Sequence, residues 1–255
     1  MADAHPFGQD LLCLPAVTPD LWLDRSVAIV GSSSGLRDAG HGADIDAHAE
    51  VIRFNGAITE GYEADAGSRT TLQVIGLDIA YLFNPKYLRP THDPDTDERH
   101  RHENARRIAA YFPDARFLTF HPDDPERNAR NRQYMTARYL QAAAPDRPVW
   151  HFAETGPGSA IAYYTANRDL EALGLERRLR HGGPRTGVKM VLRCVLAGLR
   201  PKLFGFDVDV TAETARHYHD DVTNERIGSY KAHDVLGEME VLLELRDRGL
   251  IDIAG

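Results

Sequence analysis

The sequence predicts a doubly wound α/β fold, in which a mostly parallel sheet is flanked by helices. Three observations lead to this prediction. Short apolar segments, typical of buried parallel strands, alternate along the chain with longer segments of helical composition. A loop of glycine and serine follows the first apolar segment, as it does at the nucleotide-binding edge of such sheets. With 255 residues, the chain is long enough to bury one large core.

The elements follow each other in a regular order. Residues 1–25 are predicted to form an irregular arm because Pro6, Pro15 and Pro19 interrupt any regular pattern, and residues 26–255 follow as a single domain. Strands are predicted over residues 27–30, 51–54, 70–77, 116–120, 149–153 and 202–206. Helices are predicted over residues 44–50, 103–111, 126–144, 158–173, 186–199 and 232–248.

Prolines and glycines decide several of these boundaries. The fourth strand follows Pro113, the third helix ends before Pro145, and Pro184 suits the start of the helix behind it. Gly249 ends the last helix. The segment 84–102 is rich in proline, aspartate, histidine and arginine, so it is predicted to be a long loop.

Composition excludes several classes of protein. The net charge of −8 argues against nucleic-acid binding, which usually requires a basic surface. Cys13 and Cys194 form no CxxC pair, so two reduced thiols are expected. No apolar stretch approaches the about 20 residues of a membrane helix, and residues 1–25 lack the pattern of a signal peptide. We therefore expect a soluble, cytoplasmic protein of bacterial origin, without a transmembrane segment, that works in solution or in peripheral contact with a membrane.

The first candidate site is the loop that begins with Gly31, Ser32 and Ser33. Small residues let the backbone approach a ligand closely, and their N–H groups and hydroxyls can face an anion. Asn55 follows the next strand and would reach the same edge of the sheet. The loop is neither GxGxxG nor a P-loop, since no Lys-Ser/Thr pair follows Gly35. Taken alone, it is either a phosphate site or a structural turn.

A second glycine-rich segment, residues 182–187, precedes a predicted helix. Such a segment directs free N–H groups and the positive end of the helix dipole toward the ligand edge of the sheet. Arg185 adds a positive charge suited to a carboxylate or a phosphate. Thr186 has an alternative role as the cap of that helix.

Histidines supply two further candidates. His217, Tyr218 and His219 precede two aspartates, and closely spaced His and Asp suggest a metal site. However, alternate residues on an irregular segment do not define a zinc site, and no matching set of ligands lies nearby. His233 starts a helix, with Glu238 five residues on, and a histidine at such a place is more often structural than catalytic.

Together and in this order, the segments resemble the sialylmotifs L, S, III and VS of the animal-type sialyltransferases, glycosyltransferase family 29. Residues 27–57 resemble the large motif, which continues over residues 61–71, and residues 184–206 resemble the small motif. The segment that begins at His217 stands at motif III, and residues 233–238 fit the His-x4-Glu pattern of motif VS. The resemblance implies a Rossmann-like, mostly parallel sheet of the variant GT-A type.

The resemblance also implies a reaction. Family members move sialic acid from its CMP-activated form to a sugar hydroxyl with inversion, and a related nonulosonate such as a Kdo-like sugar is an open alternative donor here. The CMP-sugar is a co-substrate, so no cofactor and no metal are expected. The acceptor would be a glycan or glycolipid, and the segment 84–102 would shape its site.

Roles for individual residues follow from the resemblance. His233 would be the general base, a role suited to a side chain with an unperturbed pKa of about 6.5. His217 would stabilise the charge on the departing CMP. Tyr218 and Glu238 would be supporting residues. The residues expected to bind the donor are Gly31, Ser32, Ser33, Asn55, Arg185, Thr186 and Gly187.

The departures from the family pattern are informative. Val27 and Gly198 stand where the motifs normally carry two disulfide-bonded cysteines, and losing both is what a reducing compartment permits. Ser32 replaces the usual asparagine of the loop, and its shorter side chain reaches less far toward a bound donor. Arg185 replaces a serine, and we hypothesise that it engages the donor phosphate or carboxylate. His219 replaces an aromatic residue, and its role is open.

Two other classes of function stay open at this point. A Rossmann-type NAD-dependent oxidoreductase is disfavoured, because GxGxxG and an acidic residue about 20 positions later do not occur together. A non-catalytic nucleotide-binding protein with the same fold is the other alternative.

Overall fold

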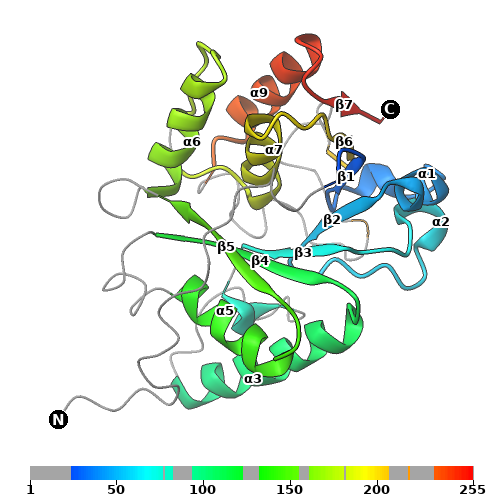
Figure 1. The fold of residues 1–255 in the computed structure, drawn as a ribbon, viewed down its shortest axis with the longest axis vertical. Coiled ribbons are helices and arrows are strands. Elements are labelled where there is room, and N and C mark those ends of the chain that lie inside the picture. Colours follow the sequence, from blue (N-terminus) through cyan, green and yellow to red (C-terminus); the bar gives the residue numbers. More distant parts are fainter. Residues whose placement is uncertain are drawn as a thin grey trace.

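The computed structural model describes residues 24–76, 78–82, 94–122, 132–154, 161–180, 182–206, 218 and 233–254. In this part of the chain, seven strands form one sheet in the order β5-β4-β3-β2-β1-β6-β7 (Figure 1). All the neighbouring strands pair in parallel, so their carboxyl ends meet at one edge. The strands are β1 (Val27–Val30), β2 (Glu50–Phe54), β3 (Leu72–Ile75), β4 (Arg116–Pro122), β5 (Val149–Glu154), β6 (Lys202–Phe204) and β7 (Asp252–Ile253).

The centre of the sheet is buried on both faces. Every residue of β1, β2 and β3 is buried, as expected for parallel strands covered on both sides. Ile29 of β1 pairs with Ile52 of β2 on one side and with Leu203 of β6 on the other. The strand order reverses between β1 and β6, and such a reversal opens a crevice where α/β proteins bind ligands.

Helices cover the two faces of the sheet in separate groups (Figure 1). The pair α3 and α5 lies on one face, where it encloses a core around Phe117, and α6, α7 and α9 lie on the other, around Leu118. A third core around Phe204 includes α1 and α2. The helices are α1 (Gly42–Ala47), α2 (Glu63–Ala66), α3 (Pro94–Tyr111), α5 (Arg132–Ala143), α6 (Ile161–Ala172), α7 (Thr186–Leu196) and α9 (Val235–Asp247), with 3-10 turns η3 (Ser34–Leu36) and η4 (Ile79–Tyr81).

The predicted fold class is confirmed, and most predicted strands and helices occur within a few residues of their expected bounds. Two helices end earlier or start later than expected for local reasons. Gly198 adopts a φ of +75°, which ends α7 before residue 199. Asp234 caps α9, which therefore begins at Val235. The elements α2, η3, η4 and the edge strand β7 were not predicted.

The predicted loop 84–102 is wrong over residues 94–102, which form the first half of α3. Pro94 fits the first turn of a helix, where its missing N–H has no partner to lose. Asp97 and Arg101 are buried despite their charge, and Arg101 forms an ion pair with Asp78 at 2.8 Å. The ion pair with Asp78 thus stabilises a helix in a segment whose polar composition favours a loop. Residues 84–93 lie outside the described residues.

Three other expectations bear on the fold. Nearly all of the predicted arm, residues 1–23, lies outside the described residues, as do residues 126–131 of the predicted third helix. Cys194 is a free, completely buried thiol, and burial raises its pKa. Within the described ranges, no helix has both the length and the apolar character needed to cross a membrane.

Candidate active site

The loop of residues 31–35, called the Gly/Ser loop below, leaves β1 at the edge where the carboxyl ends of the strands meet. Gly31 donates its N–H to the carbonyl oxygen of Phe204 at 2.7 Å, and a Cβ at Gly31 would overlap the carbonyl oxygen of Gly205. Only glycine fits there. Ser33 donates its N–H to that Gly205 oxygen at 3.2 Å, while its Oγ accepts the N–H of Gly35 at 3.0 Å. The loop is therefore held against the end of β6, at the strand-order reversal.

Asn55 follows β2 and has a left-handed backbone, φ +53°, which asparagine tolerates better than most residues. Its side-chain Oδ1 accepts the N–H of Gly76, the residue after β3, at 2.9 Å. Its backbone carbonyl accepts a hydrogen bond from Gln73 at 2.5 Å. The amide Nδ2 has no hydrogen-bond partner among the described residues. Asn55 is thus fixed, with the N–H groups of Nδ2 left to offer.

The start of α7 reaches the same place. Thr186 is the first residue of α7, and its hydroxyl lies so close to Gly76 that a Cβ there would overlap it. Gly187 comes next, where a Cβ would lie 3.0 Å from the ring of Phe206. The alternative that Thr186 caps the helix is wrong, because Arg185 occupies the cap position without a capping side-chain bond. The first N–H groups of α7 therefore keep their positive character.

The side chain of Arg185 turns instead to Glu238. The Glu238 carboxylate is fully buried, with 0% exposure. One oxygen accepts the backbone N–H of Arg185 at 2.9 Å, and the other accepts its Nε–H at 2.6 Å. The terminal nitrogens of the Arg185 guanidinium have no hydrogen-bond partner among the described residues, and the side chain is 33% exposed. Motifs S and VS are joined by this pair.

His233 is tied to the same segment. It pairs with Gly182 in an isolated antiparallel bridge, and its Nδ1 lies within hydrogen-bond distance of the Gly183 carbonyl oxygen. A carbonyl oxygen only accepts, so in the neutral imidazole Nδ1 carries the proton and Nε2 has the lone pair. Asp234 adds a further link, since its carboxylate accepts the N–H of Arg180 at 2.7 Å. His233 is thereby held in the tautomer that a general base needs at Nε2.

Tyr218 connects motif III to the Gly/Ser loop. Its N–H donates to the Ser32 carbonyl at 2.8 Å, its own carbonyl accepts from Arg37 at 2.7 Å, and its hydroxyl donates to the Ile58 carbonyl at 2.8 Å. The ring is almost completely buried, and burial raises the pKa of Tyr218 to about 12. His217 and His219 lie outside the described residues.

Arg53 of β2 holds the segment between α2 and β3, and this role was not predicted. It is fully buried, and burial lowers its pKa. Its guanidinium donates to the carbonyl oxygens of Arg69 at 3.0 Å and Ala66 at 2.6 Å. Gly76 was missed as well, although a glycine directly after a strand is a signal of close backbone approach.

The structure brings the predicted site together at one edge. The Gly/Ser loop, Asn55 and the start of α7 surround the carboxyl ends of β1 to β3. Arg185, Glu238 and His233 form a second group that adjoins α7. Among the described residues, no group of three or more His, Cys, Asp or Glu side chains is arranged to hold a metal ion.

Two of the curated proteins that this chain resembles are sialyltransferases. Alpha-N-acetylgalactosaminide alpha-2,6-sialyltransferase 1 of Homo sapiens is 24% identical over 284 residues, covering 96% of this chain and 40% of that protein. Beta-galactoside alpha-2,6-sialyltransferase 2 of Takifugu rubripes is 45% identical over 69 residues, 27% of this chain and 12% of that protein. The chain thus spans less than half the length of these curated relatives.

A solved structure shares the fold. The crystal structure of a mammalian sialyltransferase in complex with Gal-beta-1-3GalNAc-ortho-nitrophenol matches with a TM-score of 0.52 and 20% identity, over 89% of this chain and 68% of that one. A family model, Glycosyltransferase family 29 (sialyltransferase), matches residues 24–250. The expected family is therefore confirmed: the chain belongs to glycosyltransferase family 29, the sialyltransferases.

Proposed function

We propose that the chain is an inverting sialyltransferase, which moves sialic acid or a related nonulosonate from its CMP-activated form to a hydroxyl of a glycan or glycolipid. The observation that carries the proposal is the setting of His233. Its Nδ1 is occupied by the Gly183 carbonyl, its Nε2 is left as a base, and it adjoins a helix start that suits an anion.

The donor site is proposed to lie over the ends of β1 to β3. The first N–H groups of α7 and the free amide nitrogen of Asn55 are donors suited to phosphate or carboxylate oxygens. Gly31 allows close approach of the backbone, and Ser32 and Ser33 belong to the same loop. Thr186 and Gly187 would contact the cytidine or the sugar carboxylate, and Arg185 would supply the positive charge.

The proposed reaction is a single displacement. Nε2 of His233 takes the proton of the acceptor hydroxyl while that oxygen forms a bond to the anomeric carbon. The bond from this carbon to the phosphate oxygen of CMP breaks on the opposite face, which inverts the configuration. CMP leaves as an anion, and the N–H groups of α7, Asn55 and Arg185 would stabilise its charge. His217, the covalent neighbour of Tyr218, would do the same.

We also propose that this reaction needs no metal ion, because hydrogen-bond donors and Arg185 supply the positive potential at the donor site. Transfer measured in excess EDTA should match the untreated rate, and restoration by Mg²⁺ or Mn²⁺ of a lost activity would contradict this. A cytoplasmic, reducing location is proposed from Val27 and Gly198, which replace the family's two cysteines. Bacterial origin stays a prediction from the sequence.

A donor screen with a matched histidine control tests the proposal. The purified chain is incubated with CMP-sialic acid or CMP-Kdo, and release of CMP is followed with and without glycoside acceptors. His233→Ala should reduce turnover by about 10²- to 10⁴-fold. His48→Ala is the control, since His48 precedes β2 at the opposite edge of the sheet. Binding of CMP without turnover of either donor would instead identify a non-catalytic nucleotide-binding protein.

A further inference from the structure

A second charged site lies beside the proposed donor site, at the carboxyl end of the edge strand β5. Glu154 is the last residue of β5 and stands on the same face as Trp150 and Phe152, because side chains alternate along a strand. That face is covered by α6 and α7 (Figure 1). Two strand spacings, about 10 Å, separate the ends of β5 and β3. Glu154 therefore lies on the ligand edge but outside the proposed donor site.

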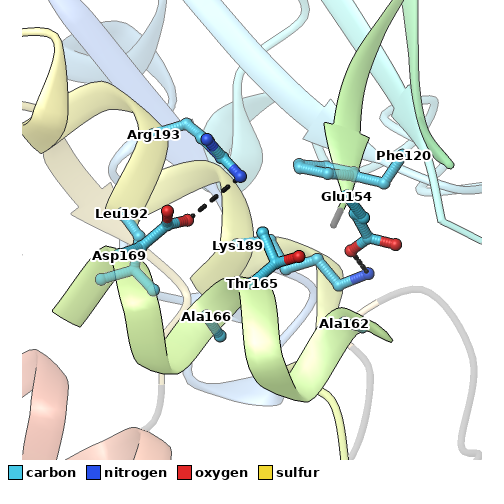
Figure 2. A pocket seen from close by; sticks show the side chains of 9 residues that line it. All are labelled: Phe120, Glu154, Ala162, Thr165, Ala166, Asp169, Lys189, Leu192 and Arg193. Atoms are coloured by element: carbon cyan, nitrogen blue, oxygen red, sulfur yellow. Dashed lines mark hydrogen bonds and ion pairs between the residues drawn. The ribbon is translucent and has the colours of Figure 1, made fainter. Parts of the chain in front are cut away.

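Lys189 of α7 pairs with this carboxylate. Its Nζ donates to Glu154 Oε1 at 2.8 Å and lies 5.0 Å from the centre of the Phe120 ring (Figure 2). The two side chains are 12% and 3% exposed, so both charges are largely removed from water. Such burial costs free energy that mutual attraction only partly returns. A pair kept at the end of a strand under this cost is a candidate for function.

The pair retains unused hydrogen-bonding capacity. Only one of the three N–H donors of Lys189 is engaged by Glu154, and Oε2 of Glu154 has no partner among the described residues. The adjoining cavity has a volume of only about 10 Å³, which admits a single water, so a ligand would meet the pair at its outer end. A carboxylate acceptor and an ammonium donor side by side match a sugar hydroxyl, which both donates and accepts.

Charge separates this site from the donor site. The first N–H groups of α7 and the terminal nitrogens of Arg185, whose charge Glu238 balances, offer only hydrogen-bond donors, which suit an anion. Glu154 and Lys189 together are neutral, which suits an uncharged, hydroxyl-rich ligand. Ala162 lines the same cavity and adjoins Gly183, whose carbonyl holds the proposed base His233. The pair thus lies beside the segment that holds the proposed base.

We propose that Glu154, held in place by Lys189, binds a hydroxyl of the acceptor glycan and so contributes to acceptor specificity. This inference rests on the proposed transferase function. A second pair supplies a matched control. Asp169 and Arg193 pair at 3.2 Å on the same faces of α6 and α7, but at the far end of the cavity (Figure 2). Asp169→Asn should affect stability without affecting the acceptor.

The test compares Michaelis constants in Glu154→Gln, Asp169→Asn and the unaltered chain, with CMP-sialic acid and Gal-β1-3GalNAc-ortho-nitrophenol as the first acceptor, then other β-galactosides. Loss of a hydrogen bond to a charged group should raise the acceptor KM about tenfold or more in Glu154→Gln only. The donor KM should stay within twofold in both variants. Where Glu154→Gln folds poorly, Glu154→Gln combined with Lys189→Gln removes both charges and gives the same readout.

Three results would overturn the inference. An unchanged acceptor KM in the Glu154 variants, with transfer by the unaltered chain intact, would overturn it alone. Equal rises in acceptor KM for Glu154→Gln and Asp169→Asn would assign both pairs a structural role only. No transfer by the unaltered chain to any acceptor would overturn the proposed function, and the inference with it.

Discussion

The carboxylate of Glu238 is completely buried, and both of its oxygens accept hydrogen bonds from Arg185. The pair joins two segments 53 residues apart, the cap position of α7 and the first turn of α9. Because Nε is occupied by Glu238, the guanidinium is fixed while its terminal nitrogens stay available for a ligand. A serine at this position would leave the carboxylate without a cation.

Stability should respond unequally to loss of the two partners. Arg185→Ala leaves a buried carboxylate uncompensated and should lower the free energy of unfolding by about 3–5 kcal/mol. Glu238→Gln leaves a guanidinium that is 33% exposed and can reach water, so the loss should be about 1–2 kcal/mol. Urea denaturation of both variants measures the difference. Equal losses would mean that the pair contributes no net charge compensation.

Donor affinity should depend on Arg185 as well. Arg185→Lys keeps the positive charge but loses the planar group, and should raise the KM for CMP-sialic acid about tenfold. Arg180→Ala is a suitable control, because Arg180 is an exposed arginine of the same segment. Initial rates over a range of donor concentrations give the donor KM and kcat. An unchanged donor KM in a folded Arg185→Lys chain would exclude the guanidinium from the donor site.

Asn55 offers a substitution that separates chemistry from backbone strain. Asn55→Asp keeps a residue type that tolerates φ +53° and keeps the oxygen that accepts the N–H of Gly76. It removes the free N–H donor and places a negative charge beside the proposed phosphate position. CMP affinity, followed by calorimetry, should fall at least tenfold while the thermal midpoint changes little. Retained CMP affinity would contradict the assignment of Asn55 to the donor site.

Local patterns in the sequence carry much of the fold. The strands of the sheet are short apolar segments with clear boundaries, so β1, β2 and β6 occur where their composition predicts them. The start of α3 does not follow its composition, because burial of Arg101 depends on Asp78, 23 residues away. The four-residue helix α2 has no periodic signal that a sequence could show.

The candidate site also contains residues that local pattern predicts and residues that only tertiary packing brings together. The glycines and Asn55 could be predicted because loops after parallel strands have few solutions for holding an anion. The partner of Arg185 could not be predicted from local pattern, since Glu238 is brought to it only by the packing of α9 beside α7. The Glu154–Lys189 pair could not be predicted either, because a single charge at a strand end reads as exposed surface.

Tyr218 makes a pH-dependent contribution that can be isolated. Burial raises its pKa from 10.0 to about 12, so the folded chain keeps the phenol protonated at a pH where the unfolded chain ionises. Its contribution to stability is therefore complete below pH 10 and is lost as the pH rises toward 12, by about 2–3 kcal/mol.

Tyr218→Phe lacks this titration and also lacks the hydrogen bond to Ile58, which costs about 1 kcal/mol. The variant should be the less stable chain at pH 8, and the difference should shrink or reverse between pH 10 and 12. Urea denaturation at pH 8, 9, 10 and 11 follows the difference, with Tyr164→Phe as the control, since Tyr164 is 46% exposed. A difference that stays constant across this range would show that the Tyr218 phenol reaches water in the folded chain, and that motif III is held to the Gly/Ser loop by its backbone contacts alone.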